Sequence, residues 1–283
     1  MRTPKPIETA EARWLLPSGL PIGRQRPFTL SQPVLRRACH SRRFRFFDAT
    51  LLLVCSGRLV LDDGQAILEA ADAASVIVVP RGACLDIAKI PEKPEGTFRS
   101  IFLTFSQYTI VEFHRLYGVT VPDETVISAP RKVLLDSAFS DTLCYCLRGL
   151  ADADASDQSQ THRLIGVLIA LADRGCQFTR STAPSIADRL RDILKSNPSH
   201  PWTAPEASRA LAMSEATLRR RLAKERSRFE GLLVEVRMHH AMTLLQTTTW
   251  SVPQVARACG YSSRTRFTER FREQFGCLPS RAR

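Results

Sequence analysis

The stretch that decides the fold occurs twice, as WTAPEASRALAMS at residues 202–214 and as WSVPQVARACGYS at residues 250–262. The offset between the copies is 48 throughout, and five of the thirteen aligned positions are identical. A self-match at a fixed offset indicates one supersecondary unit that is used twice.

Each copy begins with a Ser or Thr and a Pro, which are followed by a short helical segment with small residues at its centre. A tight break comes next, and then a serine, Ser214 or Ser262, which we expect to cap the following helix. The helices that follow are rich in arginine, EATLRRRLAKE at 215–225 and SRTRFTERFREQF at 263–275. Small residues allow two helices to cross closely, so the pattern predicts two helix-turn-helix units whose second helices can enter a major groove.

An amphipathic run of 17 residues, 229–245, lies between the copies. As a helix it would be about 25 Å long. With the width of the two units added, the recognition helices could lie roughly 34 Å apart, which is one turn of B-DNA. One chain could therefore place two recognition helices in successive major grooves.

These residues resemble the DNA-binding domain of AraC/XylS-type transcription regulators over about 185–283. The matching positions are Met213-Ser214, Thr217-Leu218, Arg220, Leu222, Arg237, Ala241, Leu244-Leu245, Val255-Ala256, Cys259 to Ser263, Phe267, Phe271, Phe275-Gly276 and Pro279-Ser280. The resemblance implies a DNA-binding regulator, most often an activator that contacts RNA polymerase. It also implies a cupin-like N-terminal barrel that can bind a small effector, and a helix pair that often forms a dimer contact. The segment RMHHAMTLL at 237–245 looks most like regulators of virulence or acid-stress genes.

Candidate DNA contacts on the first recognition helix are Ser214, Ala216, Thr217, Arg219, Arg220 and Arg221. Arg219 and Arg220 share a face with Ala216, and each could make a bidentate contact to guanine. Arg221 points elsewhere at 100° per residue, so we assign it to phosphate or a salt bridge. Leu218 and Leu222 are expected in the core.

Candidate DNA contacts on the second recognition helix are Ser262, Ser263, Arg264, Thr265, Arg266, Thr268 and Glu269. The two serines at its start suit a phosphate contact through backbone N–H groups. Glu269 either accepts from cytosine or only neutralises Arg266 or Arg270. In the linking helix, Arg237 is expected to pair with a buried acid, and His239 and His240 are taken as ordinary helix residues.

The formal net charge is +12, and the segment 185–283 holds 18 Lys+Arg against 9 Asp+Glu, a difference of +9. Charge concentrated on a double helix-turn-helix favours double-stranded DNA as the partner. The eight cysteines show no framework spacing and no CxxC, so we expect free thiols in a reducing compartment. No apolar run reaches membrane-spanning length, and a cytoplasmic location without membrane contact is expected.

The whole sequence predicts an α+β protein with four parts. They are an irregular basic arm (1–43), a cupin-like regulatory domain (44–178), a linker (179–184) and the DNA-binding domain (185–283). The arm carries one or two strands at most, and its cluster Arg36, Arg37, Arg42, Arg43 and Arg45 either touches DNA or is a solvated flank. At least six strands separated by turns are expected over 46–105, as in a small barrel or jelly roll. Helices follow over 108–117, 132–150 and 161–176.

An enzyme is disfavoured, because residues 44–105 contain no histidine and a metal cupin needs a His-rich ligand set. No metal and no cofactor are expected. The apolar helix over 161–176 either packs within its domain or forms a dimer contact. The sequence thus predicts a sequence-specific transcription regulator, more often an activator; a ligand-sensing repressor and a nonspecific architectural DNA-binding protein are the alternatives.

Overall fold

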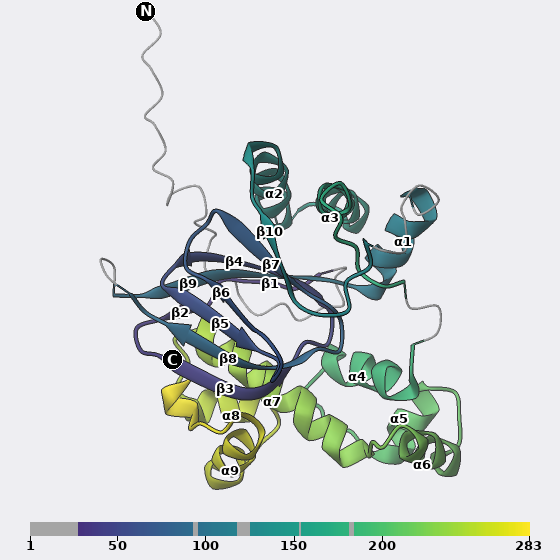
Figure 1. Ribbon diagram of the computed structural model, residues 1–283. Helices are drawn as coiled ribbons and strands as arrows, with labels where there is room; N and C mark the ends of the chain where they lie inside the picture. Colours follow the sequence, from purple (N-terminus) through teal and green to yellow (C-terminus); the bar gives the residue numbers. More distant parts are fainter. Residues whose placement is uncertain (1–27, 93–95, 118–124, 153, 181–183) are drawn as a thin grey trace, which may run out of the picture.

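The computed structural model describes residues 28–92, 96–117, 125–152, 154–180 and 184–283. The chain forms an α+β fold in which an N-terminal sheet domain is followed by a helical domain (Figure 1). Residues 1–27 of the predicted arm and residues 181–183 of the predicted linker lie outside the described residues.

Two antiparallel sheets make up the N-terminal domain. The larger has the strand order β1 (Leu30–Ser31), β9 (Phe98–Phe105), β4 (Ala49–Ser56), β7 (Ser75–Val79) and β10 (Arg131–Leu134), with β2 (Val34–Leu35) paired to β9. The smaller has the order β3 (Cys39–Arg45), β8 (Cys84–Ile90), β5 (Arg58–Asp62) and β6 (Ile67–Ala70). The hairpin expected at 62–64 joins β5 to β6, with Asp62 opposite Ile67.

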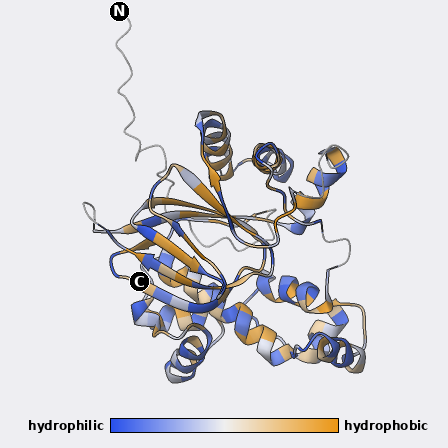
Figure 2. Ribbon diagram, in the orientation of Figure 1, coloured by the Kyte–Doolittle hydropathy of each residue, from blue (hydrophilic) through white to orange (hydrophobic). Residues whose placement is uncertain are grey.

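The central strands of the larger sheet are buried on both faces. In β4, Leu51 and Leu53 face one core, while Leu52 and Val54 face another, because successive side chains alternate across a strand. This double burial explains why these strands are continuous apolar runs, which Figure 2 shows as orange ribbon at the centre of the domain.

Three helices cover one face of the larger sheet: α1 (Gln107–Tyr117), α2 (Ser137–Leu150) and α3 (Asp157–Ala172) (Figure 1). The prediction of a helix from residue 132 was wrong over 132–134, because these residues belong to strand β10, which pairs with β7. Asp136 then caps α2 by accepting from the Phe139 N–H at 2.9 Å. The apolar face of α3 joins the core between α1, α2 and the sheet, so packing within the domain accounts for it.

The described part of the predicted arm contains three strands, wholly or in part, where one or two at most were expected. β1, β2 and most of β3 lie between residues 30 and 43, within the segment expected to be an irregular arm. The reason is tertiary: β1 and β2 are short and are held by pairing to β9, while β3 pairs with β8. A β-bulge between Ser41 and Phe44 leaves Arg42 and Arg43 exposed, and Arg43 has a φ of 50°.

The helical domain contains α4 (Ile186–Ser196), α5 (Ala204–Ala210), α6 (Glu215–Lys224), α7 (Phe229–Thr247), α8 (Val252–Ala258) and α9 (Arg264–Phe275). Ser185 caps α4 as predicted, by accepting from Asp188 N at 3.0 Å. The first helix-turn-helix has its own core, whereas buried residues of α7, α8 and α9 form one continuous cluster with the smaller sheet. The second unit is therefore docked on the N-terminal domain (Figure 1).

Candidate nucleic-acid interface

The first helix-turn-helix is built by α5, a four-residue turn and α6. Thr203 caps α5, and Ser214 caps α6 with its hydroxyl accepting from Thr217 N at 3.2 Å. Leu218 and Leu222 are buried, as predicted, and they fix α6 against the rest of the unit. The opposite face of α6, which carries its arginines, is exposed.

The second helix-turn-helix is built by α8, a five-residue turn and α9. The expected cap at Ser262 was wrong: Ser263 caps α9 by accepting from Arg266 N at 3.3 Å. The cause is that this turn is one residue longer than the first, so the helix starts one position later than the repeat implies. Phe267 and Phe271 are completely buried, as predicted.

The two turns share a left-handed residue at the same position of the repeat. Ala212 has a φ of 55° and Gly260 a φ of 76°. A Cβ at Gly260 would lie 2.9 Å from Arg237 Nη2 and 2.9 Å from Ser199 O, so glycine is needed there for space as well as for φ.

Arg237 has a different role from the one predicted. It donates to Pro198 O at 3.0 Å and to His200 O at 2.9 Å, and its guanidinium lies over the Tyr261 ring, so it holds two backbone carbonyls rather than a buried acid. An arginine with five donors in a fork can satisfy both carbonyls at once. Arg237 thereby links the loop before α5 to the turn of the second unit.

All thirteen predicted DNA contacts lie on α6, on α9 or directly before them, and none is buried. Ten are exposed: Ser214, Ala216, Arg219, Arg220, Arg221, Ser262, Arg264, Thr265, Arg266 and Glu269. Three are half-buried: Thr217, Ser263 and Thr268. Each helix thus offers a face of hydroxyls and guanidinium groups to solvent, opposite its apolar stripe.

Ion pairs leave most of these arginines available. Arg219 Nη2 lies 3.5 Å from Glu215 Oε1, and the Arg219 side chain is 80% exposed, so this pair costs little to break. On α9 the partner of Arg270 is Glu273, at 2.8 Å, and this pairing raises the pKa of Arg270. Glu273 is thus the ion-pair partner of Arg270, although the charge of Glu269 also raises the pKa of Arg270. The Glu269 side chain itself is exposed.

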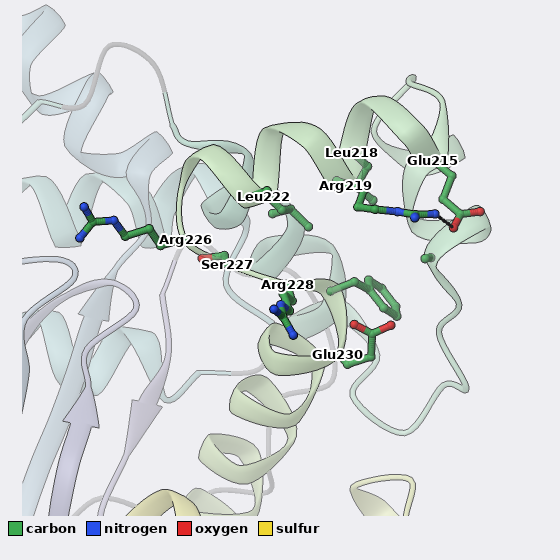
Figure 3. Close-up of a pocket in the computed structure, with 11 residues that line it drawn as sticks. Glu215, Leu218, Arg219, Leu222, Arg226, Ser227, Arg228 and Glu230 are labelled. Carbon is green, nitrogen blue, oxygen red and sulfur yellow. Dashed lines mark hydrogen bonds and ion pairs between the residues drawn. The ribbon is translucent and has the colours of Figure 1, made fainter.

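A cavity of about 690 Å³ opens between α6 and the start of α7 (Figure 3). Leu218, Leu222 and Phe229 form part of its wall, and the pair Glu215–Arg219 lies at one end. Leu222 O accepts from Ser227 N at 2.8 Å, which closes the turn between the two helices. The cavity lies beside the first recognition helix and separates it from the linking helix.

The contact between the domains contains functional candidates that the sequence did not reveal. His239 was expected to be an ordinary helix residue, but it packs against the rings of Phe44, Phe47 and Phe275, from both domains. Burial lowers its pKa to about 3, helped by the charges of Arg45 and Arg191, and its Nε2 atom has no hydrogen-bond partner.

Charged groups surround this contact. Glu235 of α7 accepts from Arg45 of β3 at 2.9 Å and from Arg191 of α4 at 3.0 Å. Lys195 lies 3.0 Å from Asp48 Oδ2, and neighbouring carboxylates raise its pKa although burial opposes this. These residues could have been found only by knowing that the sheet domain docks there.

The same contact encloses a cavity of about 210 Å³ with residues of both domains in its wall. Aromatic rings, including Phe44 and Phe102, form its apolar part, and Lys195, His239 and several threonines form its polar part. Among the described residues, no group of three His, Cys, Asp or Glu side chains could hold a metal ion. In the same part of the chain, no helix has the length and hydropathy to cross a bilayer.

Two helix-turn-helix units that share a linking helix and expose arginine-rich second helices define a DNA-binding domain. Residues 207–283 match the model of the family described as a helix-turn-helix domain. The HTH-type transcriptional regulator YdeO of Escherichia coli K12 is 35% identical over 97 residues, which are 34% of this chain and 38% of YdeO. The virulence regulon transcriptional activator VirF of Shigella flexneri is 31% identical over 123 residues, 42% of this chain and 47% of VirF.

The C-terminal part of this chain is therefore an AraC/XylS-type double helix-turn-helix domain, as the repeat and its turn residues predicted. Its relatives include a regulator of a virulence regulon, in agreement with the predicted subgroup. The matched segments span less than half the length of the curated relatives.

Solved structures extend the likeness to the whole fold. An apo variant of ToxT from Vibrio cholerae has a TM-score of 0.61 at 13% identity, and the match covers 91% of this chain and 97% of that chain. A structure of wild-type ToxT with an unsaturated fatty acid bound has a TM-score of 0.59 at 14% identity and covers 89% and 93%. At this identity the likeness shows the architecture, a sheet domain followed by a helical DNA-binding domain.

Proposed function

We propose that this protein is a sequence-specific transcription regulator that places α6 and α9 in successive major grooves of one duplex. The observation that carries the proposal is that two exposed arginine-rich helices are joined by one helix, α7, of 19 residues. At 1.5 Å per residue α7 is about 28 Å long, a length compatible with units one DNA turn apart.

The two helices have different tasks in this proposal. Arg219 and Arg220 of α6 read guanine edges, and Arg221 contacts phosphate. On α9, Arg264, Thr265 and Thr268 reach the bases, with Glu269 accepting from a cytosine, while Ser262 and Ser263 bind phosphate through backbone N–H groups. An activator that contacts RNA polymerase is the favoured mode, since VirF is named as an activator.

Selection of bound sequences from a random DNA pool tests the proposal directly. The wild-type chain should enrich two short motifs about one helical turn apart, and Arg220→Ala should cost about 1–3 kcal/mol on the selected site and relax one base position. Arg228→Ala, which removes an exposed arginine before α7, is the matched control and should leave the motif unchanged. Enrichment of no motif, or an equal loss on random DNA, would leave only a nonspecific architectural role.

Salt dependence supplies a second measurement. The logarithm of affinity should fall by roughly 0.9 per phosphate contacted for each tenfold rise in salt. An affinity that does not change with salt would remove DNA from the partners of this protein.

A small effector that binds between the domains is a further part of the proposal. The cavity of about 210 Å³ supports it, because both domains line this space and its wall combines aromatic rings with Lys195 and the unpartnered His239. The ToxT structure with an unsaturated fatty acid shows that a protein of this architecture can bind such a ligand.

Oleate can serve as the probe. It should raise the thermal midpoint of the full chain, and Thr243→Phe, which fills the cavity from α7, should abolish that rise. An equal rise in the variant would place the ligand elsewhere. Dimerisation through α2 and α3 is a separate proposal, which sedimentation of the full chain would decide.

A further inference from the structure

Two arginines of the sheet domain lie near the C-terminal end of the second recognition helix. Strand β3 is an edge strand of the smaller sheet and packs against α9 (Figure 1), where the rings of Phe44 and Phe275 stack with their centroids 6.0 Å apart. The β-bulge of β3 contains Arg42 and Arg43, and both residues are exposed. The bulge therefore presents two cations next to the end of α9.

Arg42 extends over the residue that ends α9. A Cβ at Gly276 would lie 3.2 Å from Arg42 Cδ and 3.5 Å from Arg42 Cγ, so the aliphatic part of this side chain covers the left-handed cap of the helix. Thr268, Arg272 and Gly276 follow one another at intervals of four residues, and residues at this spacing are neighbours on one side of a helix. Arg42 thus continues, beyond the end of α9, the side of the helix that carries the proposed DNA contact Thr268.

The backbone of the bulge is held in place, while its guanidinium groups are not. Arg43 has a φ of 50°, and its backbone N–H donates to Asp86 Oδ1 at 2.7 Å. Among the residues that the structure describes, neither Arg42 nor Arg43 forms an ion pair. Arg45, further along β3, is in contrast bound to Glu235 of α7 at 2.9 Å. Arg42 and Arg43 therefore have guanidinium groups available for a negatively charged partner.

Two structural roles could explain these charges without a partner. A cation at the C-terminal end of a helix stabilises the helix dipole, which applies to Arg42. Charged residues on an edge strand discourage pairing with another chain, which applies to both arginines. Neither role requires an L-residue in the left-handed conformation of Arg43, where a glycine would be free of strain. The side chain of Arg43 therefore contributes something that the turn itself does not need.

We propose that Arg42 and Arg43 bind phosphate groups of the DNA strand that borders the major groove occupied by α9. This helix has 12 residues and is about 18 Å long, whereas the major groove is about 12 Å wide, so a helix lying across the groove reaches the bordering strand with one end. The sheet domain then takes part in DNA binding directly. The inference rests on the proposed function, because it adds a contact to the same protein–DNA complex.

A phosphate contact carries no sequence information, so its loss differs from the loss of a base contact. Arg42→Gln combined with Arg43→Gln removes both charges and keeps most of the aliphatic stem that covers Gly276. This double variant should bind the selected site and random duplex more weakly by the same factor, roughly tenfold or more at about 0.1 M salt. The slope of log affinity against log salt should become smaller by roughly 1–2. Arg220→Ala, in contrast, should lose affinity mainly on the selected site.

Arg131→Gln combined with Lys132→Gln is the matched control. Both residues are exposed on β10, an edge strand of the larger sheet, and they donate to the backbone carbonyls of Gly175 at 2.8 Å and of Glu69 at 3.2 Å. The control removes the same charge from the other sheet, and its affinity and salt slope should stay close to those of the wild type. Thermal midpoints show whether each double variant is folded and how far Arg42 stabilises the end of α9.

Ethylation interference on the selected site locates the contact. Ethylation of one or two phosphates beside the half-site of α9 should impair binding of the wild type and should no longer matter for the double variant at Arg42 and Arg43. Phosphates at the half-site of α6, which is the one that Arg220→Ala relaxes, should behave alike in both proteins.

The possible outcomes separate this inference from the proposed function. A double variant that binds like the control would overturn the inference and leave the proposed function intact, whereas a wild-type chain without salt-dependent DNA binding would refute the proposed function itself. A loss of contacts spread equally over both half-sites would also overturn the inference, because it would reflect net charge alone. If the double variant is unfolded, Arg43→Gln carries the test, since Arg42 is the residue that covers Gly276.

Discussion

The turn of the second helix-turn-helix should be sensitive to a single methyl group at Gly260. An L-residue in the left-handed region costs about 1–2 kcal/mol. The added Cβ would also lie 2.9 Å from Ser199 O and from Arg237 Nη2, so either the loop or the guanidinium must move. Weakening the hydrogen bonds of a charged donor costs about 1.5–3 kcal/mol. Small movements of the loop and of Arg237 will reduce the sum of these two costs. We therefore expect Gly260→Ala to lower the free energy of unfolding by about 2–4 kcal/mol.

The repeat supplies a matched control with the opposite sign. Ala212 has a φ of 55° at the same position of the first turn, and its side chain is exposed. Ala212→Gly removes the left-handed strain of about 1–2 kcal/mol, while the freer unfolded chain costs about 0.4–1 kcal/mol. We therefore expect a net gain of about 0.5–1 kcal/mol.

Urea unfolding of the full chain, followed by circular dichroism and fluorescence, measures both variants. The midpoints should move in opposite directions, and the slopes should stay equal to that of the wild type. A neutral Gly260→Ala would mean that the turn can adopt another conformation, and the assigned roles of φ and Arg237 would then be refuted. A change in slope would show instead that the unfolding transition itself had altered.

Three further changes test the docking and the helix starts. Burial lowers the pKa of His239 to about 3, so the folded state keeps this side chain neutral. The free energy of unfolding should therefore be at its full value above about pH 6.5 and should fall as the pH drops towards 3, because the unfolded chain gains a proton there. His239→Phe should make acid unfolding curves flatter between these two pH values. Ser263→Ala should cost about 1 kcal/mol of unfolding free energy, whereas Ser262→Ala should cost less than half of this, which a pair of denaturation curves would distinguish. Glu235→Gln weakens its contacts to one arginine in each domain, and limited proteolysis should then cut between the domains several times faster; unchanged cutting would show that the apolar contact alone holds them.

Much of the helical domain could be predicted because its signals are local. The repeat, the small residues between helices, the capping Ser214 and the arginine-rich runs all lie within a few residues of the structures they form. The aromatic stripe Phe267 and Phe271 follows from helical spacing alone. The N-cap of α9 was predicted one residue too early, at Ser262 instead of Ser263. The reason is that a turn can lengthen without a change in the repeat that precedes it.

The strands of the sheet domain were also predictable where apolar runs ended at turns. The exceptions were the short strands β1, β2 and β10, and also β3, which lies mostly in the predicted arm. All four pair with strands far away in the sequence, namely β9, β7 and β8. Strand pairing is a non-local interaction, so a segment of two to four residues carries little information about it.

The sequence by itself determined the class of this protein, because the repeat and the arginine-rich runs that indicate a double helix-turn-helix are local features of the chain. Only the tertiary structure decided that the second unit docks on the smaller sheet and that His239 is buried among rings from both domains. The physical reason is that the hydrophobic effect is non-directional and depends on the total apolar area that is buried. No sequence motif in either domain therefore indicates which of its faces will contact the other domain.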